Sequence, residues 1–271
     1  MYQRHWGLNR SPFPAEVDPA RYYANPLQDE ALARLQFLVQ QRRRLGLLTG
    51  ESGTGKSLLL AVLAERLARE NRPCVRLNLT AVGAGEFPWL VAAGLGLNPG
   101  ENDSPVRLWR IIADRVAENR YQQIGTTFLF DDANPFSADV TASLLRLAQC
   151  DSSPAARLTL VLAVDAGQVS RLDARLLELA ELRIELESWD EAITAGYLSD
   201  AVTGAGGASS LFEPRATQRI QHLCAGLPRR INHLAELALA AGAGQKLPTI
   251  DAATVDAVYD ELVGVRVAQH A

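Results

Sequence analysis

The sequence predicts an α/β fold in which helices sandwich a parallel sheet, followed by a small all-helical domain. Two observations carry this prediction. Strand-like and helix-like segments alternate between residue 45 and about residue 187, which is the pattern of a parallel sheet with helical crossovers. After Trp189 the strand signal ends, and every later periodic segment has helical spacing.

Four short apolar segments supply the predicted strands: residues 45–49, 75–79, 126–130 and 158–164. Helical spacing of apolar side chains predicts crossover helices near residues 58–67, 108–116 and 140–148. Before the sheet, Asn25 as N-cap and Pro26 at the first helical position predict the start of another helix.

This order of elements divides the chain into four regions. Residues 1–44 are a lead-in segment and helix that we expect to pack on the core, and residues 45–189 form the α/β core. Residues 190–264 form the helical domain, and residues 265–271 form a tail. The helices of that domain are predicted at 190–201, 214–225, 228–243 and 251–263.

Composition narrows the function classes. Of 271 residues, 48% are hydrophobic and 21% are charged, as in a folded soluble protein. No apolar run approaches the roughly 18–20 residues that span a bilayer, so we expect a cytoplasmic protein without an intrinsic membrane segment. The formal net charge of −4 weighs against non-specific binding of nucleic acid. Cys74, Cys150 and Cys224 are widely spaced, which predicts reduced thiols and neither a disulfide framework nor a zinc site.

Residues 50–57 have the pattern GxxxxGK[ST] between a predicted strand and a predicted helix, which is the setting of a P-loop NTPase. Glycines in such a loop let successive N–H groups point at phosphate oxygens. We expect Lys56, one of two lysines in the chain, to contact the β- and γ-phosphates and the Ser57 hydroxyl to bind Mg²⁺. The expected nucleotide-binding residues are Gly50, Glu51, Ser52, Gly53, Thr54, Gly55, Lys56 and Ser57.

The apolar strand at 126–130 is followed by two acidic residues. We predict that Asp131 binds Mg²⁺ directly or through water, and that Asp132 polarises the attacking water. The alternative is an acidic turn whose aspartates cap the next helix. ATP is favoured over GTP because the chain has no NKxD motif to recognise guanine.

Longer sequence blocks point to a family. They are Trp-Gly-Leu at 6–8, Ser-Pro-Phe at 11–13, the extended P-loop at 48–57, and Gly-Leu-Pro-Arg-Arg-Ile-Asn-His-Leu at 226–234. With them the chain resembles the general secretion pathway protein A (ExeA-like) family of AAA+ ATPases over roughly residues 2–264. The resemblance implies an AAA+ core, a helical lid domain, and ATP and Mg²⁺ as cofactors.

The resemblance implies two further site residues. Arg229 lies where AAA+ relatives carry the sensor 2 arginine, facing the γ-phosphate, and Asp165 takes the sensor 1 position. The sequence departs from the family pattern: Asp132 stands where Glu is usual, Asp165 where an uncharged polar residue is usual, and no Gln-Arg pair supplies an arginine finger. The arginines nearest the expected finger are Arg171, Arg175 and Arg183.

Three function classes stay open. The leading one is a cytoplasmic AAA+ ATPase that drives or regulates assembly of a secretion or envelope complex, with a protein partner and an ATP-dependent homo-oligomer. The second is a nucleotide-gated adaptor that binds ATP without hydrolysing it. The third is a DNA-linked ATPase of transposition or replication type, which would need a basic face. The candidate clusters for that face are residues 42–44 and 229–230.

Overall fold

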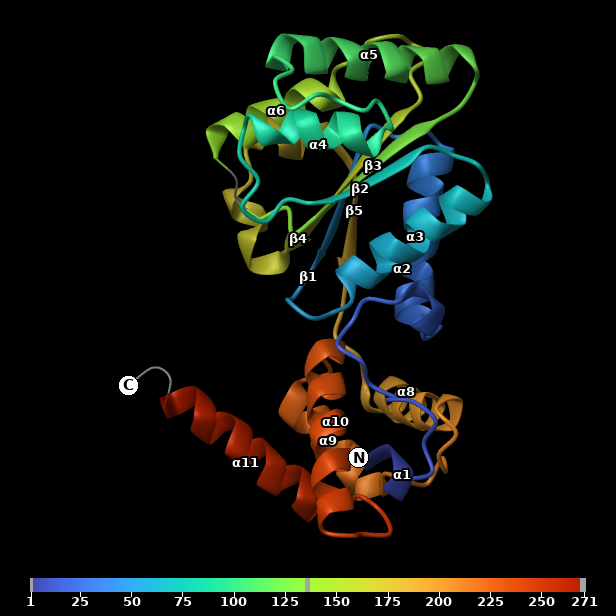
Figure 1. The fold of residues 1–271 in the computed structure, drawn as a ribbon, viewed down its shortest axis with the longest axis vertical. Coiled ribbons are helices and arrows are strands. Elements are labelled where there is room, and N and C mark those ends of the chain that lie inside the picture. The colour runs from blue at the N-terminus through green and yellow to red at the C-terminus, as the bar shows by residue number, and fades with distance from the viewer. Residues whose placement is uncertain (1, 135–136, 269–271) are drawn as a thin grey trace. The chain divides into compact units, whose positions relative to one another are not determined.

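The computed structural model describes residues 2–134 and 137–268, and its sheet has five parallel strands in the order β2-β3-β4-β1-β5. The strands are β1 (Leu45–Gly50), β2 (Cys74–Asn78), β3 (Thr126–Asp131), β4 (Leu158–Asp165) and β5 (Ala180–Leu186). Because β4 lies between β1 and β3, the carboxyl ends of these three strands are neighbours (Figure 1). The predicted parallel sheet is confirmed.

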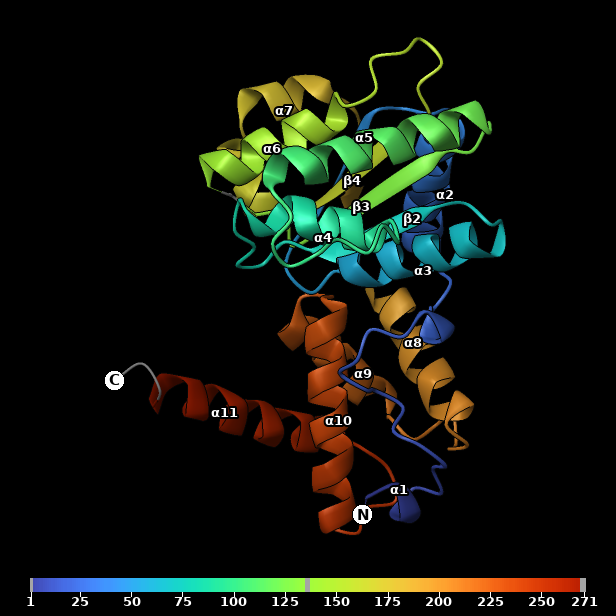
Figure 2. The same ribbon diagram turned by 45° about the horizontal axis from the view of Figure 1, so that its top comes forward.

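Helices cover both faces of the sheet (Figures 1 and 2). One face packs against α4 (Glu86–Gly94), α5 (Pro105–Tyr121), α6 (Ala138–Ala148) and α7 (Ala174–Leu179), and the other packs against α2 (Pro26–Gln40) and α3 (Lys56–Arg69). Side chains along β3 point alternately to the two faces of the sheet. Phe128 and Phe130 belong to the apolar cluster on the side of α4–α7, and Leu129 belongs to the cluster on the side of α2 and α3. The sandwich is therefore built on two separate apolar cores.

A second compact unit is helical. It contains α8 (Glu191–Gly204), α9 (Pro214–Cys224), α10 (Pro228–Gly244) and α11 (Ala252–Ala268). Asp190 caps α8 by accepting a hydrogen bond from the Ile193 N–H at 2.7 Å. The all-helical region that the sequence predicts after the α/β core is confirmed.

The first residues of the chain cluster with this helical unit. Residues 2–16, which include α1 (Tyr2–His5), group with residues 187–268. The Trp6 indole N–H donates to the Leu239 carbonyl at 2.8 Å, and the Phe13 ring packs against the rings of Tyr197 and Phe212.

This grouping corrects the expectation that all of residues 1–44 pack on the core. Residues from Val17 onward, including the 3-10 helix η1 (Pro19–Arg21) and α2, cluster with the α/β unit. The earlier residues do not, because the apolar surface that buries Trp6 and Phe13 comes from the C-terminal helices.

The end of the chain also differs from the expected tail at 265–271. Helix α11 continues to Ala268, and the last three residues of that tail lie outside the described residues. Within the described ranges, every helix is too short or too polar to cross a membrane.

The three cysteines are expected to react slowly. Burial raises the pKa of the Cys150 thiol to about 11 and the pKa values of Cys74 and Cys224 to about 12. A raised pKa keeps a thiol protonated and non-nucleophilic at neutral pH. With a thiol-specific disulfide reagent near pH 7.5, labelling of the folded protein should be at least about 100-fold slower than labelling in urea. One thiol that reacts at the unfolded rate would contradict this expectation.

Candidate nucleotide-binding site

The P-loop connects β1 to α3, as its sequence predicts. β1 ends at Gly50 and α3 begins at Lys56. Gly53 and Gly55 have φ values of +95° and +105°, in a region that side chains with a Cβ rarely adopt. These two glycines are therefore required for the loop to turn back on itself and present N–H groups at the start of α3.

Lys56 folds back over this loop. Its ammonium group donates to the carbonyl oxygens of Gly50 at 2.7 Å and Glu51 at 2.9 Å. These contacts hold the charge beside the P-loop. A phosphate bound there would lie within reach of the same ammonium group.

The first residue of the acidic pair lies at the end of β3 and is almost fully buried. The Ser57 hydroxyl donates to Asp131 Oδ1 at 3.0 Å, so the two predicted Mg²⁺ ligands are brought together. The Arg76 guanidinium, which extends from β2, pairs with Asp131 Oδ2 at 3.2 Å. A hydroxyl and a carboxylate oxygen side by side are a donor set that fits Mg²⁺.

The second residue of the pair has a different environment. Asp132 is exposed and has a φ of +49°, a left-handed conformation that aspartate tolerates better than most residues. Its Oδ2 accepts a hydrogen bond from the Asn78 amide at 2.9 Å. Asp132 therefore lies beside the metal-ligand pair, and its carboxylate is held by a side chain from β2.

Asp165 ends β4, level with Gly50 in the sheet register. Its N–H donates to Asn134 Oδ1 at 3.0 Å, and its own Oδ1 accepts from the Gly167 N–H at 3.1 Å. The second contact caps the 3-10 helix η2 (Ala166–Arg171). In this structure the carboxylate therefore has a capping role at a strand end, and the sensor 1 assignment stays a prediction.

Arg229 is in the first turn of α10, within the unit formed by residues 2–16, 52–55 and 187–268. In this unit its N–H donates to the Gly53 carbonyl at 3.1 Å. The turn before α10 needs a glycine, because a Cβ on Gly226 would lie 2.1 Å from the Trp189 carbonyl oxygen.

The arginines near the expected finger position are engaged differently. Arg175 makes two side-chain hydrogen bonds to Asp173, at 3.0 and 2.9 Å. The Arg175 hydrogen bonds lower the pKa of Asp173 to about 2. Arg171 donates to Gln168 at 3.2 Å, and Arg183 is exposed on β5. Of the three, Arg175 is the one fixed by a carboxylate.

Sequence reasoning missed three residues of this site: Arg76, Asn78 and Asn134. Arg76 and Asn78 lie two apart on β2, so both project from the same face of that strand. The signal was present as polar residues alternating with apolar ones in a predicted strand. Their partners could be identified only once β2 was known to neighbour β3.

Arg76 should stabilise the fold through Asp131. In Arg76→Gln the nearly buried carboxylate loses its cationic partner, and the unfolding free energy should fall by about 1–2 kcal/mol, a value reduced because the arginine side chain is 34% exposed. Urea denaturation measures the change. Arg69→Gln removes an exposed pair with Glu65 and should cost less than about 1 kcal/mol. Equal losses of unfolding free energy in the Arg76→Gln and Arg69→Gln proteins would contradict the stabilising role of Arg76.

Comparison with known proteins gives a family match for part of the chain. A family model described as "AAA domain" matches residues 39–172. Residues 39–172 are an AAA domain. The AAA domain begins at the end of α2, contains the P-loop, Asp131, Asp132 and Asp165, and ends before β5. Arg229 lies outside it.

A curated relative matches beyond the AAA domain. The chain is 28% identical to the "General secretion pathway protein A" of Aeromonas hydrophila over 279 residues, which cover 98% of this chain and 49% of that protein. The chain therefore spans about half the length of this relative.

Solved structures share the fold. The Aeropyrum pernix ORC2 protein in its ADPNP–ADP complexes matches with a TM-score of 0.69 and 13% identity, covering 93% of this chain and 72% of the other. The Thermotoga maritima RuvB Holliday junction branch migration motor matches with a TM-score of 0.61 and 14% identity, covering 93% and 74%. Both likenesses extend past the AAA domain into the helical region.

Proposed function

We propose that the chain binds ATP with Mg²⁺ and hydrolyses it. The contact between the Ser57 hydroxyl and the Asp131 carboxylate, at the junction of the P-loop and β3, carries the proposal. It supports a magnesium nucleotide because these two oxygens are the protein ligands that such a complex needs. The magnesium ion, when bound, neutralises charge on the phosphates.

Each residue then has a role. The loop N–H groups and Lys56 bind the phosphate oxygens, and Ser57 and Asp131 hold the metal. Asp132 accepts a proton from the attacking water or orients it. Asn78 keeps the Asp132 carboxylate in place through its amide hydrogen bond. Asp165 positions the turn after β4 beside the P-loop strand.

Binding of a fluorescent ATP analogue tests the first step. We expect saturable binding that is tighter with Mg²⁺ than with EDTA. Affinity that is the same in both conditions would contradict the role of Ser57 and Asp131.

We propose that Arg229 responds to the γ-phosphate, as the sensor 2 arginine does in the AAA+ ATPases that the chain resembles. Arg229→Ala should lower ATP turnover by about tenfold or more, because one charge-assisted contact to the γ-phosphate is lost. Arg230→Ala removes the neighbouring charge in the same turn and is the matched control. Steady-state phosphate release measures both variants, and an equal loss in the two would contradict a specific role for Arg229.

At the level of the cell, we propose that the ATPase drives or regulates assembly of a secretion or envelope complex. The relative named "General secretion pathway protein A" supports this role. The role requires a protein partner and a compartment with ATP, which is the cytoplasm. In the organism that encodes the chain, Lys56→Ala should reproduce the secretion defect of a gene deletion, and normal secretion in both strains would contradict the role.

A nucleotide-gated adaptor is the second candidate. One observation favours it. The Asp132 side chain is one methylene shorter than that of glutamate, and its carboxylate is already hydrogen-bonded to Asn78. A base displaced by about 1 Å can cost on the order of 100-fold in rate. Tight ATP binding without turnover at any protein concentration would favour the adaptor over the ATPase.

A further inference from the structure

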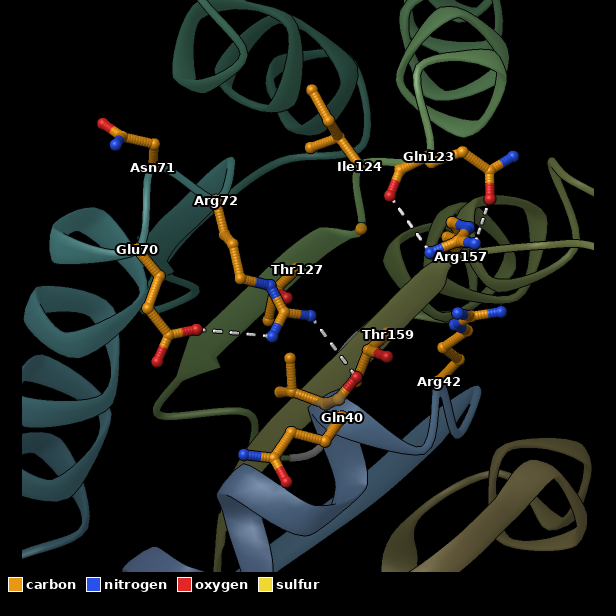
Figure 3. A pocket seen from close by; sticks show the side chains of 12 residues that line it. Gln40, Arg42, Glu70, Asn71, Arg72, Gln123, Ile124, Thr127, Arg157 and Thr159 are labelled. Carbon is orange, nitrogen blue, oxygen red and sulfur yellow. Dashed lines mark hydrogen bonds and ion pairs between the residues drawn. The ribbon is translucent and has the colours of Figure 1, made fainter.

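A polar hollow lies at the opposite end of the sheet from the P-loop (Figure 3). Its volume is about 360 Å³. It is bordered by the turns that follow α2, α3 and α5 and by the first residues of β3 and β4. None of its lining residues belongs to the nucleotide-binding site described above.

Positive charge dominates the lining. Arg42, Arg72 and Arg157 border the hollow, against one acidic lining residue, Glu70. Arg72 pairs with Glu70 at 3.6 Å and donates to the Val39 carbonyl at 3.5 Å. Three lining arginines against one carboxylate leave a formal excess of positive charge.

The other two arginines differ in what they already bind. Arg157 donates to the Gln123 carbonyl at 3.0 Å, so it satisfies a carbonyl just after the end of α5, as Arg72 does at the end of α2. The Arg42 guanidinium makes no hydrogen bond or ion pair within the described residues. Of the three arginines that line the hollow, Arg42 is therefore the one whose charge is available to a ligand.

Two buried hydroxyls lie beneath these arginines. Thr127 and Thr159 are register partners on β3 and β4 and are 1% and 2% exposed. They project to the face covered by α2 and α3, but these helices end at Gln40 and Arg69 and leave the first residues of the strands to the hollow.

The Thr127 hydroxyl has no hydrogen-bond partner among the described residues. A buried unpaired hydroxyl costs free energy, which a ligand or an ordered water at the site would recover. A hollow that binds an apolar or amide-rich ligand would not need arginines and hydroxyls together.

We propose that this hollow binds the phosphate group of a small molecule. Phosphate oxygens accept hydrogen bonds from guanidinium and hydroxyl donors, and a guanidinium matches a phosphate in a bidentate way. The volume lies at the lower end of the range of about 300–1,000 Å³ for small-molecule pockets. Since Arg43 is held by Glu181 at 3.1 Å, residues 42–44 do not present a continuous basic stripe, and a small ligand is favoured over a DNA backbone.

The test uses the full chain with Lys56→Ala, which removes the principal cation of the P-loop. Anion binding at the hollow is then measured independently of whether the P-loop binds ATP. Inorganic phosphate and pyrophosphate are titrated by calorimetry. Adding Arg42→Ala should weaken binding about tenfold. Arg110→Ala, an exposed arginine on α5 outside the hollow, should leave it unchanged.

A second variant keeps the proposal falsifiable if Arg42→Ala unfolds. Thr127→Val is close in shape and should weaken pyrophosphate binding several-fold while a thermal melt shows the protein folded. Absence of binding up to about 10 mM, or equal affinity in the Arg42→Ala and Arg110→Ala proteins, would overturn the proposal. Binding of a short DNA duplex without binding of either small anion would also overturn it.

Discussion

Lys56→Ala is expected to lower ATP affinity by at least about 100-fold, the largest effect on nucleotide binding that one side chain of this protein should produce. The ammonium group is held beside the P-loop by the carbonyls of Gly50 and Glu51. Alanine leaves the loop N–H groups in place but removes the full positive charge that meets the β- and γ-phosphates. A fluorescent ATP analogue, titrated with Mg²⁺ present, measures the loss.

The chain provides its own control for this experiment. Lys246, the other lysine, lies just after α10 in the helical unit. Lys246→Ala removes the same charge and should bind ATP as the unaltered protein does. Full affinity in the Lys56→Ala protein, with an unchanged thermal melt, would refute the P-loop assignment.

Asp132→Asn is expected to reduce ATP turnover by about 100-fold to 10,000-fold while ATP affinity changes by less than about threefold. The amide keeps the size of the side chain and its place beside Asp131 but cannot accept a proton from water. Steady-state phosphate release and nucleotide binding, measured on the same preparation, separate the two effects. A rate equal to that of the unaltered protein would remove Asp132 from the mechanism.

Two companion variants strengthen this second prediction. Asp132→Glu lengthens the side chain by one methylene and should keep measurable turnover, since the carboxylate is retained. Asn78→Ala removes the amide that donates to Asp132 at 2.9 Å and should lower turnover less than Asp132→Asn does. A larger loss in Asn78→Ala would mean that the asparagine acts on the substrate itself.

Much of the fold could be predicted because its elements have strong local signals. The buried strands β1, β3 and β4 are continuous apolar runs, and Asn25 caps α2 through a bond to the Gln28 N–H as its sequence suggests. Helix α4 was not predicted, because Pro88 and flanking glycines weaken the helical signal there. Its place is fixed by tertiary packing of Phe87, which is fully buried.

The site could be predicted only as far as its residues belong to recognisable motifs. The loop 50–57 and the pair Asp131–Asp132 are each such a motif, and both are expected to hold one Mg²⁺, so the contact between Ser57 and Asp131 follows although 74 positions separate them. The ion pair of Arg76 with Asp131 joins residues 55 positions apart on neighbouring strands. Strand order decides such a contact, and no spacing in the sequence encodes it.

The helical unit combines residues 2–16 with residues 187–268, and this has a consequence for synthesis on the ribosome. Trp6, Leu8 and Phe13 are made before the helices that cover them, which begin at Glu191. At about 5–20 residues per second, roughly 10–35 seconds pass before those helices emerge. During that interval the apolar segment of residues 6–13 is exposed on the nascent chain, so chaperone capture should concentrate on this segment and end once α10 has been released.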